Sequence, residues 1–271
     1  MKKLKKWLKE MYKIINNPTV KILPGQIAFF LILSIFPLLL VVGYVASFFD
    51  VSVTTFIKMI GDALPKEIAD VLISYINGKS FDGSIGVTIF VGLFLASNGS
   101  HAIITASNAL YGFPPDDIVK RRVKALFLIL ILVTLFAFIL VVLAYGNVIA
   151  KWFITTFNLP DIADTIYKIF IFVKWPIAMI IMYFTIKLIY VISPDWQILS
   201  RNTTKGALFT TTGWLLATAI FSFYVSHLSR YDIFYGSLAN VIALMIWVYF
   251  ISYILVVGIA INVKEYRDKE E

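Results

Sequence analysis

Polar side chains recur along one face of the apolar run 84–112. At about 100° per residue along a helix, an imidazole, an amide and two hydroxyls share this face, from Ser97, His101, Thr105 and Asn108. Such groups can bond a neighbouring helix or bind a polar ligand in a cavity, and both alternatives stay open. The opposite face would let another helix approach closely, because it carries Gly92, Ala96, Gly99, Ala102 and Ala106.

A second polar stripe lies on the last apolar run, 237–262. Helical spacing aligns Gly236, Asn240, Trp247, Gly258, Asn262 and Glu265, with Ser237 at the edge of the stripe. An amide in lipid needs hydrogen-bond partners, so we expect the stripe to face inward. We predict that Asn240 and the polar face of the run 84–112 line one cavity.

Cations near the ends of the apolar runs could bind an anionic headgroup. The candidates are Lys174, Arg201 and Arg230. Lys174 lies beside Pro176 and about 20 Å along a helix from Lys187, so these two lysines could instead extend toward opposite interfaces. The apolar runs contain no Asp or Glu, and the sequence therefore gives no support to proton or sodium coupling through intramembrane carboxylates.

Residues that catalysis would need are scarce. The chain has no cysteine, which excludes thiol nucleophiles and cysteine metal sites. Ribonuclease chemistry needs paired carboxylates with metal ions, or histidines as acid and base. However, His101 is predicted inside the bilayer and His227 at its edge, while Asp116 and Asp117 fit a solvated turn. We expect no enzymatic activity, no cofactor and no bound metal.

Transmembrane helices are the elements that must position these residues. The 271-residue chain is 60% hydrophobic and 15% charged, and its mean hydropathy is +0.86, which is typical of an integral membrane protein. A helix needs about 20 apolar residues to cross the bilayer. Six runs reach this length, at 27–49, 84–112, 125–153, 169–193, 206–228 and 237–262. The predicted fold class is all-α, a polytopic bundle of six transmembrane helices.

Basic residues concentrate in alternate connections. The positive-inside rule then places both termini in the cytoplasm and explains the net charge of +8 without nucleic acid. Residues 1–23 are predicted to form a basic amphipathic helix on the lipid surface, with breaks at Pro18 and at Pro24–Gly25. Residues 24–265 would form the transmembrane domain and 266–271 a charged cytoplasmic tail. A second amphipathic helix is expected in the long outer connection.

The block 206–262 resembles the C-terminal signature of the YihY/BrkB family. The matching positions are Gly206, Trp214, Phe221, Tyr224, Tyr235, Gly236, Ser237, Trp247, Gly258 and Asn262, and the segments AFFLILSIFPLLL and ASNALYG followed by KRR are also similar. The resemblance implies a six-helix inner-membrane fold and an envelope role. The family has carried ribonuclease and virulence-factor names, and neither supplies a mechanism. Family members often have an acidic residue where this chain has Ala260, so that role is absent here or has moved to Glu265.

Two functions fit these features. One is a translocator, flippase-like or exporter-like, of lipids or other amphiphiles in the bacterial plasma membrane, with anionic headgroups favoured. The other is an envelope scaffold whose polar residues only bond helices together. A polar cavity open to one leaflet would favour the translocator, and a closed, dry bundle the scaffold. Expected partners are membrane lipids and a second copy of the chain, but not nucleic acid. The predicted ligand-binding residues are Ser97, His101, Thr105, Asn108, Lys174, Arg201, Arg230, Tyr235, Gly236, Ser237, Asn240, Trp247 and Asn262.

Overall fold

The computed structural model describes residues 12–13, 16, 18–47, 84–114, 117–156, 163–227 and 239–270. The elements within this part of the chain are α2 (Pro18–Ser47), α5 (Ser84–Tyr111), α6 (Ile118–Thr156), α7 (Ala163–Ile192), the 3-10 helix η2 (Ser200–Thr203), α8 (Thr204–His227) and α10 (Ala239–Glu270). All are helices, so the all-α fold class is confirmed for these residues. Most of the predicted N-terminal surface helix, and all of the predicted outer-loop helix, lie outside the described residues.

Each of the six predicted apolar runs overlaps one long helix over nearly its whole length. By length and composition, two described segments are able to cross a membrane, Ser200–Tyr224 and Val241–Lys269. Shorter apolar stretches cover Val20–Leu33 and Pro176–Ile192. The number of crossings and the side on which each terminus lies stay predictions.

The chain does not break at Pro24 and Gly25, contrary to the sequence prediction. α2 begins at Pro18, a residue type favoured in the first helical turn, and continues without interruption through Pro24 to Ser47. The prolyl ring removes one helical hydrogen bond near the start of α2. Packing offsets this loss, because Val20 and Ile27 on the same helix are both 0% exposed.

The turn between α5 and α6 follows from its residue types. Gly112 has a φ of 77°, which a glycine adopts without strain, and its N–H bonds the Asn108 carbonyl at 2.9 Å. This is a typical glycine end to a helix. Asp117 then caps α6, since its Oδ1 accepts the N–H of Val119 at 2.7 Å. Asp117 therefore has the structural role of an N-cap.

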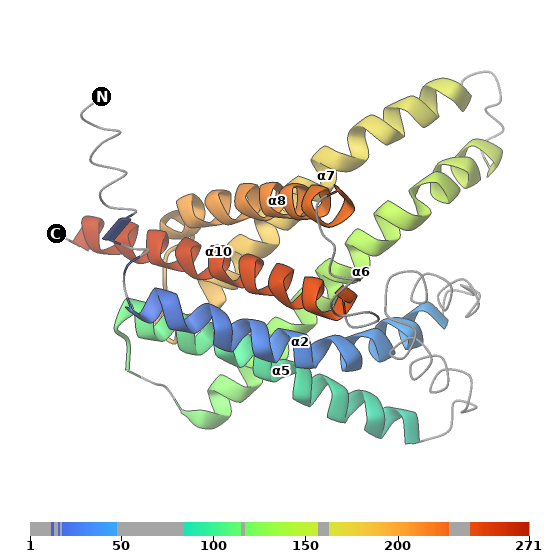
Figure 1. Ribbon diagram of the computed structural model, residues 1–271. Helices are drawn as coiled ribbons and strands as arrows, with labels where there is room; N and C mark the ends of the chain where they lie inside the picture. The colour runs from blue at the N-terminus through green and yellow to red at the C-terminus, as the bar shows by residue number, and fades with distance from the viewer. Residues whose placement is uncertain are drawn as a thin grey trace, which may run out of the picture.

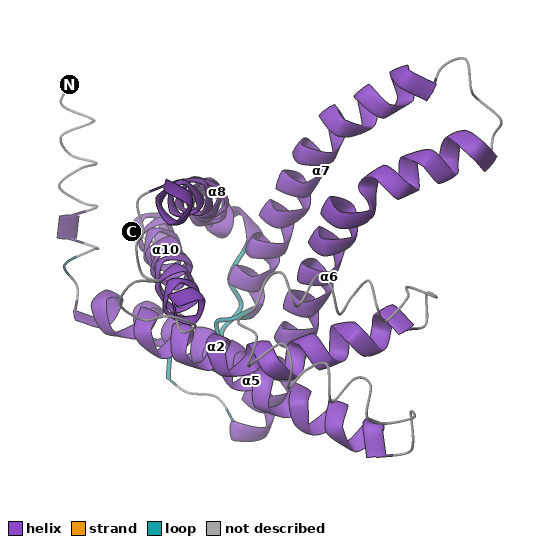
Figure 2. Ribbon diagram, turned by 45° about the vertical axis from the view of Figure 1, so that its right-hand side comes forward, coloured by secondary structure: helices purple, strands orange, loops and turns teal. Residues whose placement is uncertain are grey.

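Four helices run together, and α6 and α7 leave them as a pair. α2 lies along α5, and α10 lies between α2 and α8. The small face of α5 allows the first contact, because a Cβ on Gly99 would lie 3.1 Å from Leu31 Cδ2. The far halves of α6 and α7 run side by side, away from α8 and α10 (Figures 1 and 2).

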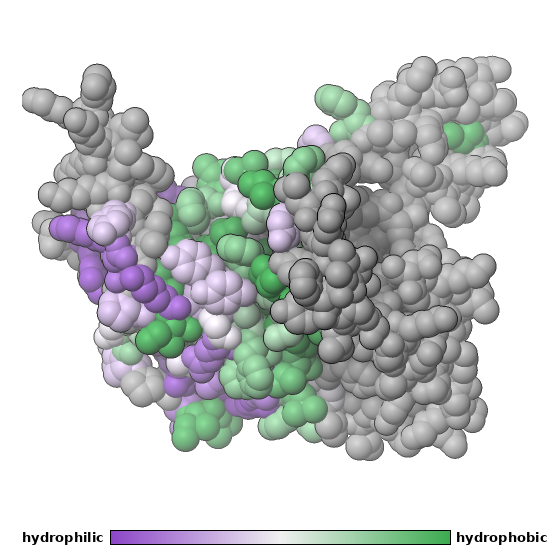
Figure 3. All heavy atoms as spheres, viewed as in Figure 1, coloured by the Kyte–Doolittle hydropathy of each residue, from purple (hydrophilic) through white to green (hydrophobic). Residues whose placement is uncertain are grey.

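Polar groups gather at the end of the molecule that holds the C-terminus and the start of α2 (Figure 3). An aromatic cluster ties this charged end together. Phe113 stacks on Tyr111 with ring centroids 5.1 Å apart and lies 6.0 Å from both Trp196 and Tyr266. The connections after α5 and after α7 therefore meet the end of α10, which is the arrangement that a common cytoplasmic side would require.

Burial along α7 and α8 decreases away from the charged end. In α8, Ala207 is 0% exposed whereas Ile220 is 68% exposed. In α7, Ile186 is 0% exposed whereas Phe172 is 78% exposed. The described bundle is thus closely packed at its charged end, and farther along these two helices turn apolar side chains outward.

Candidate functional site

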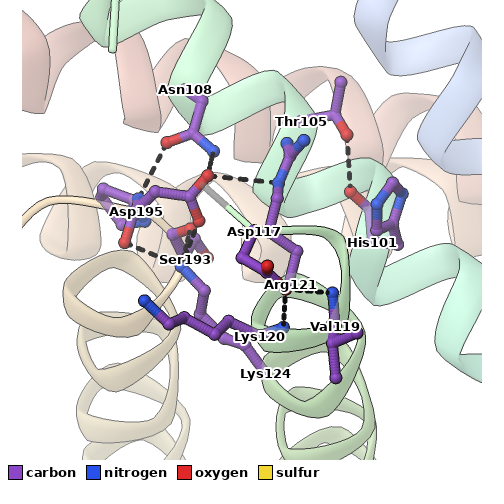
Figure 4. A network of polar contacts seen from close by, with 11 residues as sticks. His101, Thr105, Asn108, Asp117, Val119, Lys120, Arg121, Lys124, Ser193 and Asp195 are labelled. Atoms are coloured by element: carbon purple, nitrogen blue, oxygen red, sulfur yellow. Dashed lines mark hydrogen bonds and ion pairs between the residues drawn. The ribbon is translucent and has the colours of Figure 1, made fainter. Parts of the chain in front are cut away.

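Asp195 carries a buried carboxylate at the charged end. It follows α7 in the turn after Pro194, and its side chain is 0% exposed. Its backbone N–H donates to Asn108 Oδ1 at 2.8 Å, and Asn108 Nδ2 donates to its Oδ2 at 2.6 Å. One amide on α5 therefore holds both the backbone and the side chain of Asp195 (Figure 4).

Two cations of α6 complete the cluster. Lys124 Nζ lies 2.5 Å from Asp195 Oδ1, and Arg121 Nε lies 3.1 Å from Oδ2. Their i, i+3 spacing places both on one face of α6. We call this cluster, made of Asn108, Arg121, Lys124 and Asp195, the Asp195 knot. Because one carboxylate faces two cations, the knot has an excess of positive charge.

The knot joins α5, α6 and the connection from α7 to α8. Lys124 Nζ also donates to the Pro194 carbonyl at 3.0 Å, which fixes the turn as well as the carboxylate. The side chains of Arg121 and Lys124 stay 15% and 20% exposed. Since breaking a buried pair leaves the remaining charge uncompensated, the four side chains stabilise this end of the bundle as a unit.

Two hydroxyls of the predicted polar face of α5 bond their own helix. Ser97 Oγ donates to the Phe94 carbonyl at 2.6 Å, and Thr105 Oγ1 donates to the His101 carbonyl at 3.0 Å. Such bonds satisfy a hydroxyl without another helix. Asn108 instead reaches across to Asp195. Of these three contacts only the Asn108–Asp195 contact leaves α5, and the cavity predicted to join this face to Asn240 stays a prediction.

The predicted stripe on α10 packs against α8. Asn262 Oδ1 accepts the Gly206 N–H at 2.8 Å. Gly206 lies in the first turn of α8, where N–H groups lack a partner in their own helix, so Asn262 caps a helix other than its own. We call this contact the α8–α10 seam, formed by Gly206, Thr210, Trp214 and Thr218 of α8 with Trp247, Gly258 and Asn262 of α10.

Close backbone approach explains the two glycines of the seam. A Cβ on Gly206 would collide with the Gly258 carbonyl oxygen and the Asn262 side chain, and a Cβ on Gly258 would collide with Thr210 and Tyr190. The Tyr190 hydroxyl lies 2.6 Å from Thr210 Oγ1 and donates to the Leu255 carbonyl at 2.9 Å. Tyr190, which is 2% exposed, therefore ties α7 to the seam.

Two indoles extend the seam along the helices. Trp214 Nε1 donates to the Ile251 carbonyl at 2.9 Å, and Trp247 Nε1 lies 3.3 Å from Thr218 Oγ1. Gly206, Trp214, Trp247, Gly258 and Asn262 are also positions that carry the family resemblance. Their common location indicates that much of this signature specifies helix packing.

Glu265 pairs with two lysines where the seam reaches the charged end. Lys205 Nζ lies 2.5 Å from Oε2, and Lys269 Nζ lies 2.9 Å from Oε1. Lys269 also donates to Asn202 Oδ1 of η2 at 3.0 Å. This carboxylate joins α8 to α10, while Ala260, the position where family members often have an acid, is 7% exposed and packs in the core.

The other predicted site residues are not brought into one place by the described contacts. Arg201 is exposed on η2. Lys174 lies in α7 and Asn240 in α10, but their side chains lie outside the described residues, as do Arg230 and residues 235–237 entirely.

The sequence prediction included only Asn108 of the knot and omitted Arg121, Lys124 and Asp195. Asp195 lies just past the end of an apolar run, in SPDW. Asp195 directly follows a span-length run, and basic residues at i, i+3 spacing follow another run on the same expected side of the membrane. This combination could have indicated an ion pair between the two segments.

These features define an all-helical membrane protein whose charged end is tied by a buried ion cluster. The chain belongs to the BrkB family, since the family described as "Virulence factor BrkB" matches residues 12–271. The membership predicted from the block 206–262 is therefore confirmed.

Relatives are similar to this chain to different extents. YfkH of Bacillus subtilis (strain 168), named a ribonuclease-like protein, is 24% identical over 269 residues, covering 97% of this chain and 96% of YfkH. The UPF0761 membrane protein IL2447 of Idiomarina loihiensis is 26% identical over 98 residues, covering 35% and 34% of the two chains. A UPF0761 membrane protein of Glaesserella parasuis is 27% identical over 82 residues, covering 30% and 29%. No solved structure matches the chain.

Proposed function

We propose that this chain is a multi-pass protein of the bacterial plasma membrane that moves lipids or other amphiphiles between leaflets and catalyses no chemical reaction. In this proposal the charged end faces the cytoplasm, together with both termini. The connections after α5 and after α7 lie at this end with the end of α10, and the basic residues that follow them, at the start of α6 and in η2, support the assignment.

The observation that carries the proposal is the asymmetric closure of the bundle. The Asp195 knot ties α6 and the end of α7 to α5 at the charged end. Farther along, the ribbons of α6 and α7 diverge from those of α8 and α10 (Figure 1), and Ile220 of α8 and Phe172 of α7 are 68% and 78% exposed. Helices that are tied at one end and turn apolar side chains outward beyond it support the proposal, because an amphiphile could contact them from the side.

Lipid translocation by the purified full chain tests the proposal. Vesicles would carry a fluorescent lipid in both leaflets, with a quencher that cannot cross the membrane added outside. We expect the protein to expose inner-leaflet label that protein-free vesicles protect, with an anionic label moving faster than a zwitterionic one. Inner-leaflet label that stays protected for both lipids, in vesicles that contain folded protein, would contradict the proposal.

A scaffold is the second candidate, and the α8–α10 seam favours it. The stripe that could have lined a cavity is occupied in its described part by contacts with α8, including the Asn262–Gly206 and Trp247–Thr218 bonds. A scaffold needs only such packing. The translocation assay separates the two candidates, because a scaffold moves no lipid.

A further inference from the structure

Arg122 differs from its neighbour Arg121 in the partners that surround it. Arg121 pairs with the carboxylate of Asp195. Arg122 instead turns to α5, where Nη1 donates to Asn98 Oδ1 at 2.8 Å and Nη2 donates to the Phe94 carbonyl at 2.9 Å. Both of these acceptors are neutral, so they orient the guanidinium without balancing its charge.

The guanidinium also lies over an aromatic ring. Arg122 Cζ lies 3.7 Å from the ring centroid of Phe94, which is a cation–π contact. Its Nε is buried and has no acceptor among the described residues. A guanidinium has five N–H donors, and the two described acceptors use one donor on each Nη. The guanidinium is therefore fixed in place, and one N–H on each Nη remains for another acceptor.

Apolar surface leads away from this cation along α5. Phe90, Phe94 and Asn98 follow one another at four-residue intervals and share one face of the helix. Phe90 is 67% exposed and Phe94 is 44% exposed. The rings extend from Arg122 toward the start of α5, away from the charged end at which α5 finishes.

We propose that Arg122 and Asn98 bind the phosphate headgroup of an anionic glycerophospholipid, whose acyl chain lies along Phe94 and Phe90. An oriented guanidinium suits phosphate, because its N–H groups match the oxygens in pairs. Basic sites between transmembrane helices near the cytoplasmic side are places where anionic headgroups bind. The site does not depend on translocation, since a scaffold would hold the same lipid.

Lipid retention by the purified full chain tests this site without any transport step. Native mass spectrometry in detergent would compare phosphatidylglycerol with phosphatidylcholine. We expect the wild type to retain phosphatidylglycerol preferentially and Arg122→Gln to weaken its binding about tenfold or more. Arg267→Gln removes an exposed arginine from the same charged end and should leave the preference unchanged. Equal retention by folded Arg122→Gln and wild type would overturn the proposal.

A second variant keeps the test decisive if Arg122→Gln does not fold. Asn98→Asp places a carboxylate beside the guanidinium, so it should preserve or raise the thermal midpoint while expelling phosphatidylglycerol. A purely structural arginine would gain the same stability with no change in lipid retention, and that result would overturn the site. Glycerol 3-phosphate, which has no acyl chain, should fail to displace the lipid; displacement at concentrations equal to those of the lipid would assign the site to free phosphate instead.

Discussion

The Asp195 knot and the α8–α10 seam close the same end of the bundle by different means. The knot joins charged side chains from separate segments, with Lys124 and Asp195 lying 71 residues apart. The seam is neutral and depends on two glycines and on side chains that cap backbone groups. Coulomb attraction falls gradually with distance, whereas a glycine contact leaves no room for even one methyl group.

This difference indicates which part of the bundle is able to move. The seam joins α8 and α10 as a rigid pair, because any shift would break a cap and a close backbone contact together. The knot fastens α6 to the connection after α7 through charges that remain partly exposed. Because Tyr190 holds α7 in the seam, we expect α6 to be the element that separates if the charged end opens.

Removing the central carboxylate of the knot should have the largest effect. Asp195→Ala leaves Arg121 and Lys124 without their anion, so we expect the free energy of unfolding to fall by about 3 kcal/mol. This is at the lower end for a buried pair, because both cations keep some contact with water. Thermal unfolding of the purified protein in detergent measures the change.

Asp117→Ala is the matched control for this experiment. It removes an aspartate whose described bonds cap the first turn of α6, and such a cap contributes only about 1 kcal/mol. Equal losses from the two substitutions would mean that the knot adds nothing beyond an ordinary polar contact, and the comparison with the seam would fail.

The seam should respond to a single added methyl group. Gly206→Ala places a Cβ against the Gly258 carbonyl and the Asn262 side chain, and overpacking of this kind costs about 2 kcal/mol. Adding Asn262→Ala should not restore the loss, since the Gly258 carbonyl cannot move without its helix and the Gly206 N–H loses its acceptor. Thermal unfolding of the single and double variants gives the coupling free energy between positions 206 and 262.

Gly25→Ala is a control that should change stability in the opposite direction. Gly25 lies within α2 with nothing within 4 Å of its added Cβ, so the higher helix propensity of alanine should stabilise the protein by up to about 1 kcal/mol. A stabilised Gly206→Ala protein would show that the seam has more room than its glycines imply.

A smaller effect is expected at the ion pair that links the seam to the charged end. Glu265→Gln removes the charge that faces Lys205 and Lys269, whose side chains are 68% and 39% exposed. Exposed pairs contribute less than about 1 kcal/mol and are screened by salt. The difference in thermal midpoint between wild type and variant should therefore shrink as salt rises, and a difference independent of salt would show that Glu265 acts by packing.

Periodicity predicted the helices, and it predicted which faces of them turn inward. The small face of α5 does meet α2 at Gly99, and the stripe on α10 does hold Trp247, Gly258 and Asn262 against α8. What periodicity could not supply is the partner of each face. A stripe that packs on a helix and one that lines a cavity have the same spacing, so the sequence left both alternatives open.

The Asp195 knot could not be predicted from the pattern of any single segment. Asp195 lies in a connection, where no helical period assigns it a face, and its partners come from α5 and α6. Helix continuity through Pro24 was missed for a related reason, because the packing of Val20 and Ile27 decides it. Both cases depend on tertiary contacts that override the local preference of the residue.

Asn240 offers the smallest expected change in stability and the sharpest contrast with the seam. It shares its predicted stripe with Asn262, whose amide oxygen caps α8. Loss of such a buried partner costs about 1–3 kcal/mol. If Asn240 instead faces a hydrated cavity, water already satisfies its amide, so Asn240→Leu should leave the thermal midpoint nearly unchanged while slowing lipid translocation in vesicles. Asn262→Leu is the matched amide substitution and should lower the midpoint clearly. An Asn240→Leu protein as unstable as Asn262→Leu would extend the packed seam to the far end of α10, and the stripe would then serve the scaffold.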